Sequence, residues 1–382
     1  MKFFWWVCVS VAALTTTAAV TADVEYNWRN NRTTGQIMFK TTTSSPSGHW
    51  NKALLSGSSW FGFETQDFVI NGLWNHPVSF YIETLEQLGI NIIRIPFSAE
   101  WVLYNWDLYP YDGLVGADPL VQNKMSREIL DIVIQEAADH GMGVMLDLHR
   151  LHKEYISELW YSPTDNQYTY ENWFQTWFTI LDYVLPRHNN IVAIDLQNEP
   201  HGPANWGSDD PATDWRLFVQ TAIPRIQDRY PSSQFLFFIE GVEWGHTLEG
   251  WHQKNRPLDL PEPLLDRVVF SPHTYGKSVV PSTPDDVGSL RWSWDDDFGF
   301  LRDLGFPIVV GEWGGRTDLD QTWMNHLVDY LIAKNCTNQF FWSLGPNSGD
   351  VNGILLDDWT TVDGFKREVI QRVVPEPTKF VF

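Results

Sequence analysis

Eight short runs of β-branched and aromatic residues recur along the chain, and they constrain its fold more than any other feature. The runs cover residues 59–63, 91–95, 143–148, 191–196, 235–239, 268–271, 307–310 and 338–342. Most are nearly continuous in apolar residues rather than alternating with polar ones. Such runs are typical of strands buried on both faces, as in a parallel sheet.

Segments with helical periodicity lie between these runs. Apolar residues recur at spacings of three and four in the ranges 82–88, 125–137, 215–222 and 323–331. Gly141 stands where the second of these would be capped at its C-terminus, and Asp214 precedes the third as an N-cap. Eight strands alternating with helices predict an α/β fold, the (β/α)8 TIM barrel.

A doubly wound open sheet is the competing fold. It requires a glycine-rich phosphate-binding turn after its first strand, and the sequence WFGFETQDF at residues 60–68 does not supply one. We therefore expect one catalytic barrel domain over residues 23–382.

The first 22 residues have the pattern of a secretory signal peptide. Lys2 precedes an apolar run at residues 3–14, and small residues follow it. We place cleavage after Ala22, with Ala19 as the alternative. A membrane anchor is the competing interpretation, but the run is shorter than the ~20 residues that a span requires. We expect a secreted, extracellular protein that has no membrane attachment after cleavage.

Charge limits the possible binding partners, and cysteine content limits the possible disulfides. The chain has 26 basic and 48 acidic residues and a formal net charge of −22, which disfavours nucleic acid and suits a neutral substrate. Beyond the signal peptide only Cys336 remains, so no internal disulfide can form. Asn31 and Asn335 begin acceptor patterns for N-glycosylation. We expect a monomer.

Polar and aromatic side chains stand at the carboxyl ends of the predicted strands, where a TIM barrel places its chemistry. They are Arg94, Asp147, His149, Asn198, Glu199, Glu240, His273, Tyr275, Glu312 and Trp342. Any one of them alone has a structural explanation, such as a satisfied hydrogen bond or an ion pair. Their convergence on one rim favours an active site. Pro200 favours extended backbone at Glu199, which would project that side chain at the rim.

Two glutamates on opposite sides of a barrel mouth suit glycoside hydrolysis. One protonates the leaving oxygen, and the other attacks the anomeric carbon or activates water. The acid needs a raised pKa, whereas the nucleophile needs positive charge and hydrogen-bond donors nearby. Arg94 and Tyr275 can supply these to one glutamate, and Asn198 can donate to a sugar 2-hydroxyl.

Several stretches closely resemble glycoside hydrolase family 5. They are DLQNEPHG, FSPHTYG, VVGEWGG, IRIPFS, LDLHR and FFWSL. Within this family the chain is similar to bacterial-type endo-β-1,4-glucanases, through WFGFET, NGLWNHP, ELWY and GILLDDWTTVD. The resemblance runs from about residue 54 to about residue 363.

The resemblance implies a retaining endo-β-1,4-glucanase that acts on β-glucan polysaccharide without a metal or other cofactor. Glu199 matches the acid/base of the family and Glu312 its nucleophile. The remaining family residues, which contact substrate, match Arg94, His149, Asn198, His273, Tyr275 and Trp342. Trp60 and Trp206 align with tryptophans that stack on glucose rings in related cellulases.

Other functions remain open at this point. Related barrels act on mannan, xyloglucan or β-1,3-glucan, and a barrel of this kind can also bind carbohydrate without cleaving it. A metal-dependent hydrolase would use histidines as ligands, and the candidates are His149, His152, His201 and His273. The first strand, however, offers such a metal only Glu64.

Tryptophan is abundant, with 21 residues, and we expect most of them in the core. Three pairs lie instead in polar surroundings rich in Gly, Pro and Asp, where exposed rings would form flat binding platforms. These pairs are Trp101/Trp106, Trp244/Trp251 and Trp292/Trp294.

Overall fold

A computed structural model describes residues 25–41 and 48–382 of the chain. The predicted signal peptide, residues 1–22, lies outside the described residues. In the part that the structure describes, no helix is long and apolar enough to cross a membrane.

Nine parallel strands form a sheet that curls into a barrel, in the order β10-β11-β12-β4-β5-β6-β7-β8-β9. We call each position in the barrel wall a stave. β9 and β10 are two pieces of one stave, separated by residues 271–272, so the nine strands form eight staves. This stave pairs with β8 on one side and with β11 on the other, which closes the ring. The strands are β4 (Ser56–Ser59), β5 (Ile92–Ser98), β6 (Gly143–Arg150), β7 (Ile191–Asp195), β8 (Leu236–Ile239), β9 (Val268–Phe270), β10 (His273–Tyr275), β11 (Val310–Gly314) and β12 (Gln339–Phe341).

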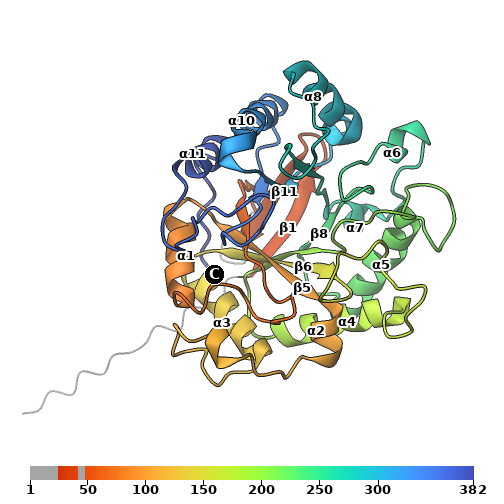
Figure 1. Cartoon of the computed structure of the whole chain (residues 1–382). Coiled ribbons are helices and arrows are strands. Elements are labelled where there is room, and N and C mark those ends of the chain that lie inside the picture. The colour runs from red at the N-terminus through yellow and green to blue at the C-terminus, as the bar shows by residue number, and fades with distance from the viewer. Residues whose placement is uncertain (1–24, 42–47) are drawn as a thin grey trace, which may run out of the picture.

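Helices surround the sheet and shield its outer face from water (Figure 1). They are α1 (Val78–Gln87), α2 (Ala99–Tyr104), α3 (Ser126–Asp139), α4 (Tyr170–Val184), α5 (Trp215–Arg229), α6 (Gly250–Gln253), α7 (Glu262–Leu265), α8 (Val287–Trp294), α9 (Phe300–Asp303), α10 (Thr317–Lys334) and α11 (Gly364–Val373). Two short helices of other types are η1 (Asp112–Leu114) and η2 (Asp295–Gly299). The predicted (β/α)8 barrel is confirmed.

Each predicted strand overlaps a stave, but two are displaced along the chain. The first stave begins at Ser56, whereas the prediction began at residue 59. Its residues are small and mostly polar, so they do not form the apolar run on which the prediction was based. A Cβ atom at Gly57 would lie 2.2 Å from the Phe340 ring, so this stave must be small to admit that ring into the barrel. The seventh stave begins at Val310 instead of residue 307, which places Glu312 within the strand.

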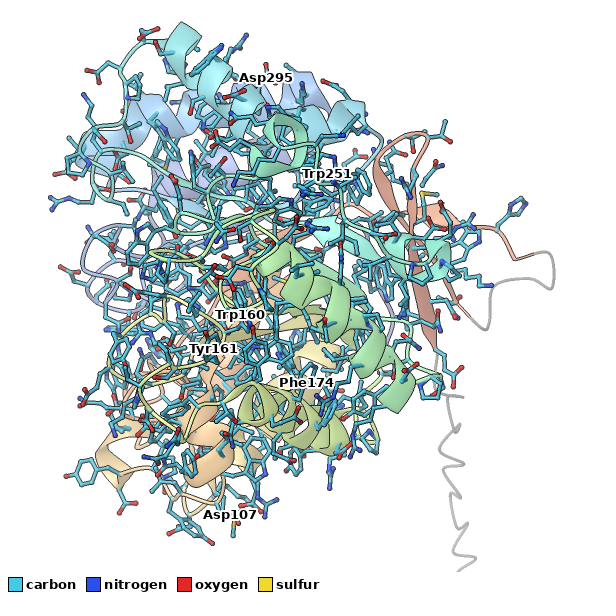
Figure 2. The ribbon with its side chains drawn as sticks, turned by 90° about the vertical axis from the view of Figure 1, so that its right-hand side faces the viewer. Asp107, Trp160, Tyr161, Phe174, Trp251 and Asp295 are labelled. Carbon is cyan, nitrogen blue, oxygen red and sulfur yellow. The ribbon has the colours of Figure 1, made fainter. Side chains whose placement is uncertain are left out.

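Aromatic side chains fill much of the layer between barrel and helices, as expected from the tryptophan content. Trp160 and Phe174 lie in this layer beside α4 and α5 (Figure 2), and the Trp160 ring stacks on Phe218 at 4.9 Å. Asp214 is confirmed as the N-cap of α5, because its carboxylate accepts from the backbone N–H of Arg216 at 3.0 Å. The first residue of this helix, Trp215, reaches the active-site rim described below.

A small antiparallel sheet, which the sequence analysis did not predict, closes the amino-terminal end of the barrel. It consists of β1 (Tyr26–Asn31), β2 (Gln36–Thr41) and β3 (Asn51–Lys52), and Figure 2 shows it at one side of the molecule. Trp28 and Ile37 from this sheet are buried in one cluster with Phe340 of the barrel interior and with Phe380. The Tyr26 hydroxyl also donates to the Val381 carbonyl at 3.0 Å.

Candidate active site

A cleft of about 820 Å³ opens at the carboxyl ends of the staves. Its lining includes six of the predicted site residues, namely His149, Glu199, His273, Tyr275, Glu312 and Trp342. Arg94 and Asn198 lie directly beneath this lining and are 0% exposed. The structure therefore brings together all eight residues that match the family's active-site set.

Arg94 is the centre of the buried polar network. Its guanidinium group contacts four carboxyl groups and one amide, at 3.1 Å for Asp147, 3.2 Å for Asp195, 3.3 Å for Glu240 and 2.9 Å for Asn198, with Glu312 as the fourth carboxyl. One positive charge cannot compensate four carboxylates. Burial raises the pKa of Asp147 to about 7 and that of Asp195 to about 6, although Arg94 opposes both shifts. Burial also raises the pKa of Glu240 well above its usual value.

Glu312 departs from the other carboxyl groups around Arg94, because its pKa is lowered. Burial alone would raise this pKa, but the positive charges of His273 and Arg94 outweigh that effect. The Tyr275 hydroxyl adds to the lowering by donating to Glu312 Oε2 at 2.6 Å. Negative charge is therefore favoured at Glu312, as a nucleophile requires.

Glu199 has the opposite electrostatic character. Burial raises its pKa, and the nearby charge of Glu312 raises it further, although a hydrogen bond from His273 opposes the shift. The predicted extended backbone at Glu199 is wrong, since its φ is 50°, in the left-handed region. Two neighbours hold this conformation: the Glu240 carboxylate accepts from the Glu199 N–H at 2.6 Å, and the carbonyl of Pro200 accepts from Trp244 N–H at 3.2 Å.

His273 lies between the two glutamates. Its Nδ1 is 3.1 Å from Glu199 Oε1 and 3.7 Å from Glu312 Oε2, and its Nε2 is 3.2 Å from Glu240 Oε1. Burial disfavours its charged form, but Glu240 and Glu312 outweigh burial and raise the pKa of His273 well above its usual value. One carboxylate oxygen from Glu199 and one from Glu312 lie within 4.8 Å of each other around this imidazole.

Three parallel rings, two of which line the cleft, lie beside these groups. The Trp342 indole stacks on His149 at 5.2 Å and on Phe61 at 5.4 Å, with interplanar angles of 5° and 11°. Burial lowers the pKa of His149 well below its usual value, and its Nδ1 is 2.7 Å from Asp147 Oδ2. The imidazole is therefore neutral and fixed in one orientation by Asp147.

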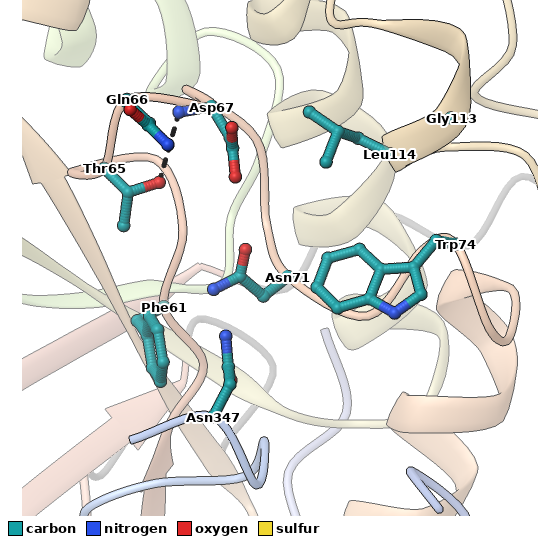
Figure 3. A pocket seen from close by; sticks show the side chains of 9 residues that line it. All are labelled: Phe61, Thr65, Gln66, Asp67, Asn71, Trp74, Gly113, Leu114 and Asn347. Atoms are coloured by element: carbon teal, nitrogen blue, oxygen red, sulfur yellow. Dashed lines mark hydrogen bonds between the residues drawn. The ribbon is translucent and has the colours of Figure 1, made fainter. Parts of the chain in front are cut away.

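A second pocket of about 450 Å³, shown in Figure 3, is lined by Phe61, whose ring stacks on Trp342 of the cleft. Trp74 and Leu114 provide apolar surface there, and amide, hydroxyl and carboxylate groups surround them. The Trp74 side chain is 37% exposed. The lining residues are Phe61, Thr65, Gln66, Asp67, Asn71, Trp74, Gly113, Leu114 and Asn347. None of them was predicted as a site residue from the sequence, although the resemblance motif WFGFET contains Phe61 and Thr65, and NGLWNHP contains Asn71 and Trp74.

The structure does not bring Trp60 and Trp206 to the cleft. Each side chain is 1% exposed, and each indole N–H is already bonded to backbone, at 2.8 Å to Asn71 O and at 2.8 Å to Arg256 O. Neither indole therefore offers a free face to a sugar.

Two of the predicted platform tryptophans, Trp294 and Trp244, line the cleft, but Trp294 is only 2% exposed, so the exposed platform is Trp244. Its side chain is 53% exposed, and its indole stacks on His201 at 3.5 Å, so the ring is held in place on one side. Trp101, Trp251 and Trp294 are buried in the core, whereas Trp292 is 71% exposed on α8.

The four histidines considered as metal ligands do not converge. His152 lies 3.5 Å from Glu100, and the His201 ring contacts Trp244. Within residues 25–41 and 48–382, the groupings with suitable ligand spacing are Asp195/Glu240/His273 and Glu199/His273/Glu312. Each contains one histidine, and each includes carboxylates that already accept from Arg94.

Comparisons with known proteins agree with this geometry. The family described as cellulase (glycosyl hydrolase family 5) matches residues 50–348. An endoglucanase of Paenibacillus polymyxa is 34% identical over 356 residues, which cover 85% of this chain and 83% of that protein. The major extracellular endoglucanase of Xanthomonas campestris pv. campestris is 33% identical over 81% of this chain and 65% of its own length.

Solved structures give the same result. An endocellulase variant from Pyrococcus horikoshii, crystallised in complex with cellotetraose, superposes with a TM-score of 0.81 at 30% sequence identity. The match covers 91% of this chain and 98% of that one.

We predict that Arg94→Met destabilises the protein more at pH 7 than at pH 5. Removing one partner of a buried ion pair costs about 3–5 kcal/mol. Without the guanidinium the neighbouring carboxyl groups have still higher pKa values in the folded state than in the unfolded chain. The folded variant then binds extra protons, and each one lowers stability by about 1.4 kcal/mol for each unit of rising pH.

Urea unfolding at the two pH values measures this effect. Arg225→Met is the control, because Arg225 pairs at the surface with Glu171, and its loss should cost less than about 1 kcal/mol at either pH. An Arg94→Met penalty that is equal at both pH values, or larger at pH 5, would contradict the prediction.

Proposed function

The chain belongs to glycoside hydrolase family 5, and from this we propose that it is a retaining endo-β-1,4-glucanase with Glu312 as nucleophile and Glu199 as acid/base. The observation that carries the assignment is the pairing of Glu199 and Glu312 around His273. Their oxygens lie within 4.8 Å, which suits the separation of about 5–5.5 Å in retaining enzymes and not the wider gap of inverting ones. The pKa of Glu199 is raised and that of Glu312 is lowered.

In the first step, the Glu312 carboxylate attacks the anomeric carbon while Glu199 gives its proton to the leaving oxygen. A glycosyl–enzyme ester forms at Glu312, and the bond to the leaving sugar breaks. The Tyr275 hydroxyl and the Arg94 guanidinium hold the attacking carboxylate in place before the reaction. As the negative charge of Glu312 is consumed, that charge no longer raises the pKa of Glu199, so the ionised form of Glu199 becomes more favourable.

In the second step, Glu199 accepts a proton from water while the water oxygen attacks the anomeric carbon. The bond from that carbon to the Glu312 oxygen breaks, and the Glu312 carboxylate leaves. Asn198 supports both steps. Its Oδ1 accepts from Arg94, whereas its buried Nδ2 has no partner among the described residues and is free to donate to a sugar 2-hydroxyl. A hydrogen bond to that hydroxyl strengthens in the transition state.

The substrate assignment draws on the relatives. Curated relatives are named endoglucanases, and the Pyrococcus horikoshii endocellulase binds cellotetraose. An open cleft between Trp244 and the pocket at Trp74 suits an internal segment of a glucan chain. We also propose secretion, supported by the signal-peptide pattern and by the extracellular relative of Xanthomonas campestris.

A viscosity assay tests endo action on β-1,4-glucan. The viscosity of carboxymethylcellulose should fall early relative to the reducing ends released, because internal cleavage shortens chains rapidly. A slow fall with cellobiose as the sole early product would exclude endo action. Faster release from mannan, xyloglucan or β-1,3-glucan would move the specificity to another β-glycan, and loss of activity in chelator would favour the metal-dependent alternative.

Azide distinguishes the roles of the two glutamates. Glu199→Ala should still form the glycosyl–enzyme from dinitrophenyl cellobioside, because this leaving group needs no protonation, but the intermediate should accumulate. Azide needs no general base and fits the space left by the carboxylate. It should therefore restore turnover and yield the β-glycosyl azide, the product of two inversions, which NMR identifies.

Glu312→Ala is the matched variant, and it should give no β-azide. Any rescue there should give the α-anomer, from a single inversion. The opposite pattern in the two variants would reverse the assignment. If Glu199→Ala kept wild-type activity on cellulose, Glu199 would not be the acid.

The second pocket should contribute to binding of longer chains. Stacking of a sugar on an indole contributes on the order of 1 kcal/mol, so Trp74→Ala should raise KM for cellohexaose roughly five- to tenfold. The value for dinitrophenyl cellobioside, which is too short to span both pockets, should change little. Trp292→Ala serves as control, because this ring is 71% exposed on α8 and lines neither pocket. Equal effects on both substrates would contradict the pocket's role.

A further inference from the structure

We propose that Glu240 is a positioning residue for the acid/base half of the site, which fixes both the backbone and the side chain of Glu199 for proton transfer. This inference rests on the proposed function, in which Glu199 is the acid/base. Glu240 follows β8 and is 0% exposed, and both of its carboxylate oxygens already contact protein groups, so we assign it no contact with the substrate.

One oxygen of Glu240 holds the backbone of Glu199. Glu240 Oε2 accepts from the Glu199 N–H at 2.6 Å. Glu199 has a φ of 50°. Residues other than glycine adopt this backbone conformation at a cost in free energy, so it persists only where neighbouring groups enforce it. The following residue is Pro200, which has no N–H of its own to anchor the turn. The bond to Glu240 is therefore the anchor on the N-terminal side of this turn.

The other oxygen of Glu240 holds the side chain of Glu199 through His273. Glu240 Oε1 is 3.2 Å from His273 Nε2, and His273 Nδ1 is 3.1 Å from Glu199 Oε1. The two oxygens thus close a ring that runs from the Glu199 peptide through Glu240 and His273 to the Glu199 carboxyl group. Movement of Glu240 would shift the proton donor at both ends.

Neighbouring residues fix the position of Glu240. Trp215, at the start of α5, donates from its indole N–H to the Glu240 carbonyl at 3.0 Å. Gly245 has a φ of 72°, and a Cβ atom at this position would lie 2.5 Å from Glu240 Oε2. The loop after β8 therefore leaves room for the carboxylate only because residue 245 has no side chain.

Glu240 also contacts Arg94 at 3.3 Å, and through Arg94 it could instead serve the nucleophile Glu312. Asp195 separates these two roles. It accepts from Arg94 at 3.2 and 3.3 Å and also lies within 4.8 Å of Glu240 and His273, but the Glu199 N–H donates to Glu240 and not to Asp195. A change at Asp195 therefore disturbs the support of the nucleophile and leaves the bond to the Glu199 peptide in place. Asp195→Asn and Glu240→Gln form a matched pair of isosteric changes.

The test compares kcat/KM for aryl β-cellobiosides whose leaving groups range from dinitrophenol to phenol. Glutamine offers one carbonyl oxygen, so Glu240→Gln cannot accept both from the Glu199 peptide and from His273. The loss should be about 100-fold or more for the phenyl glycoside, which needs an acid, and within about threefold for the dinitrophenyl glycoside. Asp195→Asn should lower both values by similar factors.

Glu199→Ala in the same series separates this inference from the proposed function. If Glu199→Ala shows no selectivity for the leaving group, the assignment of the acid/base fails. If Glu199→Ala is selective and Glu240→Gln lowers all values equally or none, the assignment stands and the role of Glu240 is overturned.

A second variant covers the case in which Glu240→Gln does not fold. Gly245→Ala keeps every charge but displaces the Glu240 carboxylate, so it should reproduce the selective loss on poor leaving groups. Thermal unfolding and circular dichroism show whether each variant is folded. A folded Gly245→Ala protein with a uniform loss, or with no loss, would overturn the proposal.

Discussion

A single buried guanidinium group, that of Arg94, determines how charge is distributed in the active site. Four carboxyl groups surround it, and Arg94, Asp147 and Asp195 are 0% exposed. Burial of several acids around one cation favours protonation of most of them. The acid whose pKa is lowered is Glu312, which receives the charges of His273 and Arg94 and, alone among the four, a hydrogen bond from the Tyr275 hydroxyl. The opposite pKa shifts of Glu199 and Glu312 thus follow from the charged groups in the barrel interior beneath them.

The sequence was sufficient to predict the barrel and the convergence of the eight proposed site residues, because strand ends in this fold meet at one rim. The sequence was less informative where packing across the barrel determines the position of a strand or a side chain. Ser56–Ser59 form a stave without an apolar run, since their small size is complementary to Phe340 from the neighbouring stave. Trp60 and Trp206 were predicted as sugar platforms, but the backbone carbonyls that bind their N–H groups come from positions that periodicity does not reveal.

Local rules also failed at Glu199. The preference of a residue before proline for extended backbone is a property of the dipeptide, whereas the observed φ depends on a carboxylate 41 residues away. Trp74 and the pocket of Figure 3 were missed for a related reason: this pocket unites the loop after β4, the turn at η1 and the loop after β12. Such sites arise where three loops meet, and a motif in one loop does not reveal which residues of the other two will face it.

The small sheet at the amino-terminal end of the barrel also fixes where the two ends of the described chain lie. Tyr26 and Val381 are 355 positions apart in sequence, yet they share a hydrogen bond on the side opposite the cleft. A short peptide joining these positions would have little distance to span, so the fold is suited to circular permutation. Likewise, a second module fused near either position would extend away from the bound polysaccharide, leaving the cleft unobstructed on a solid surface.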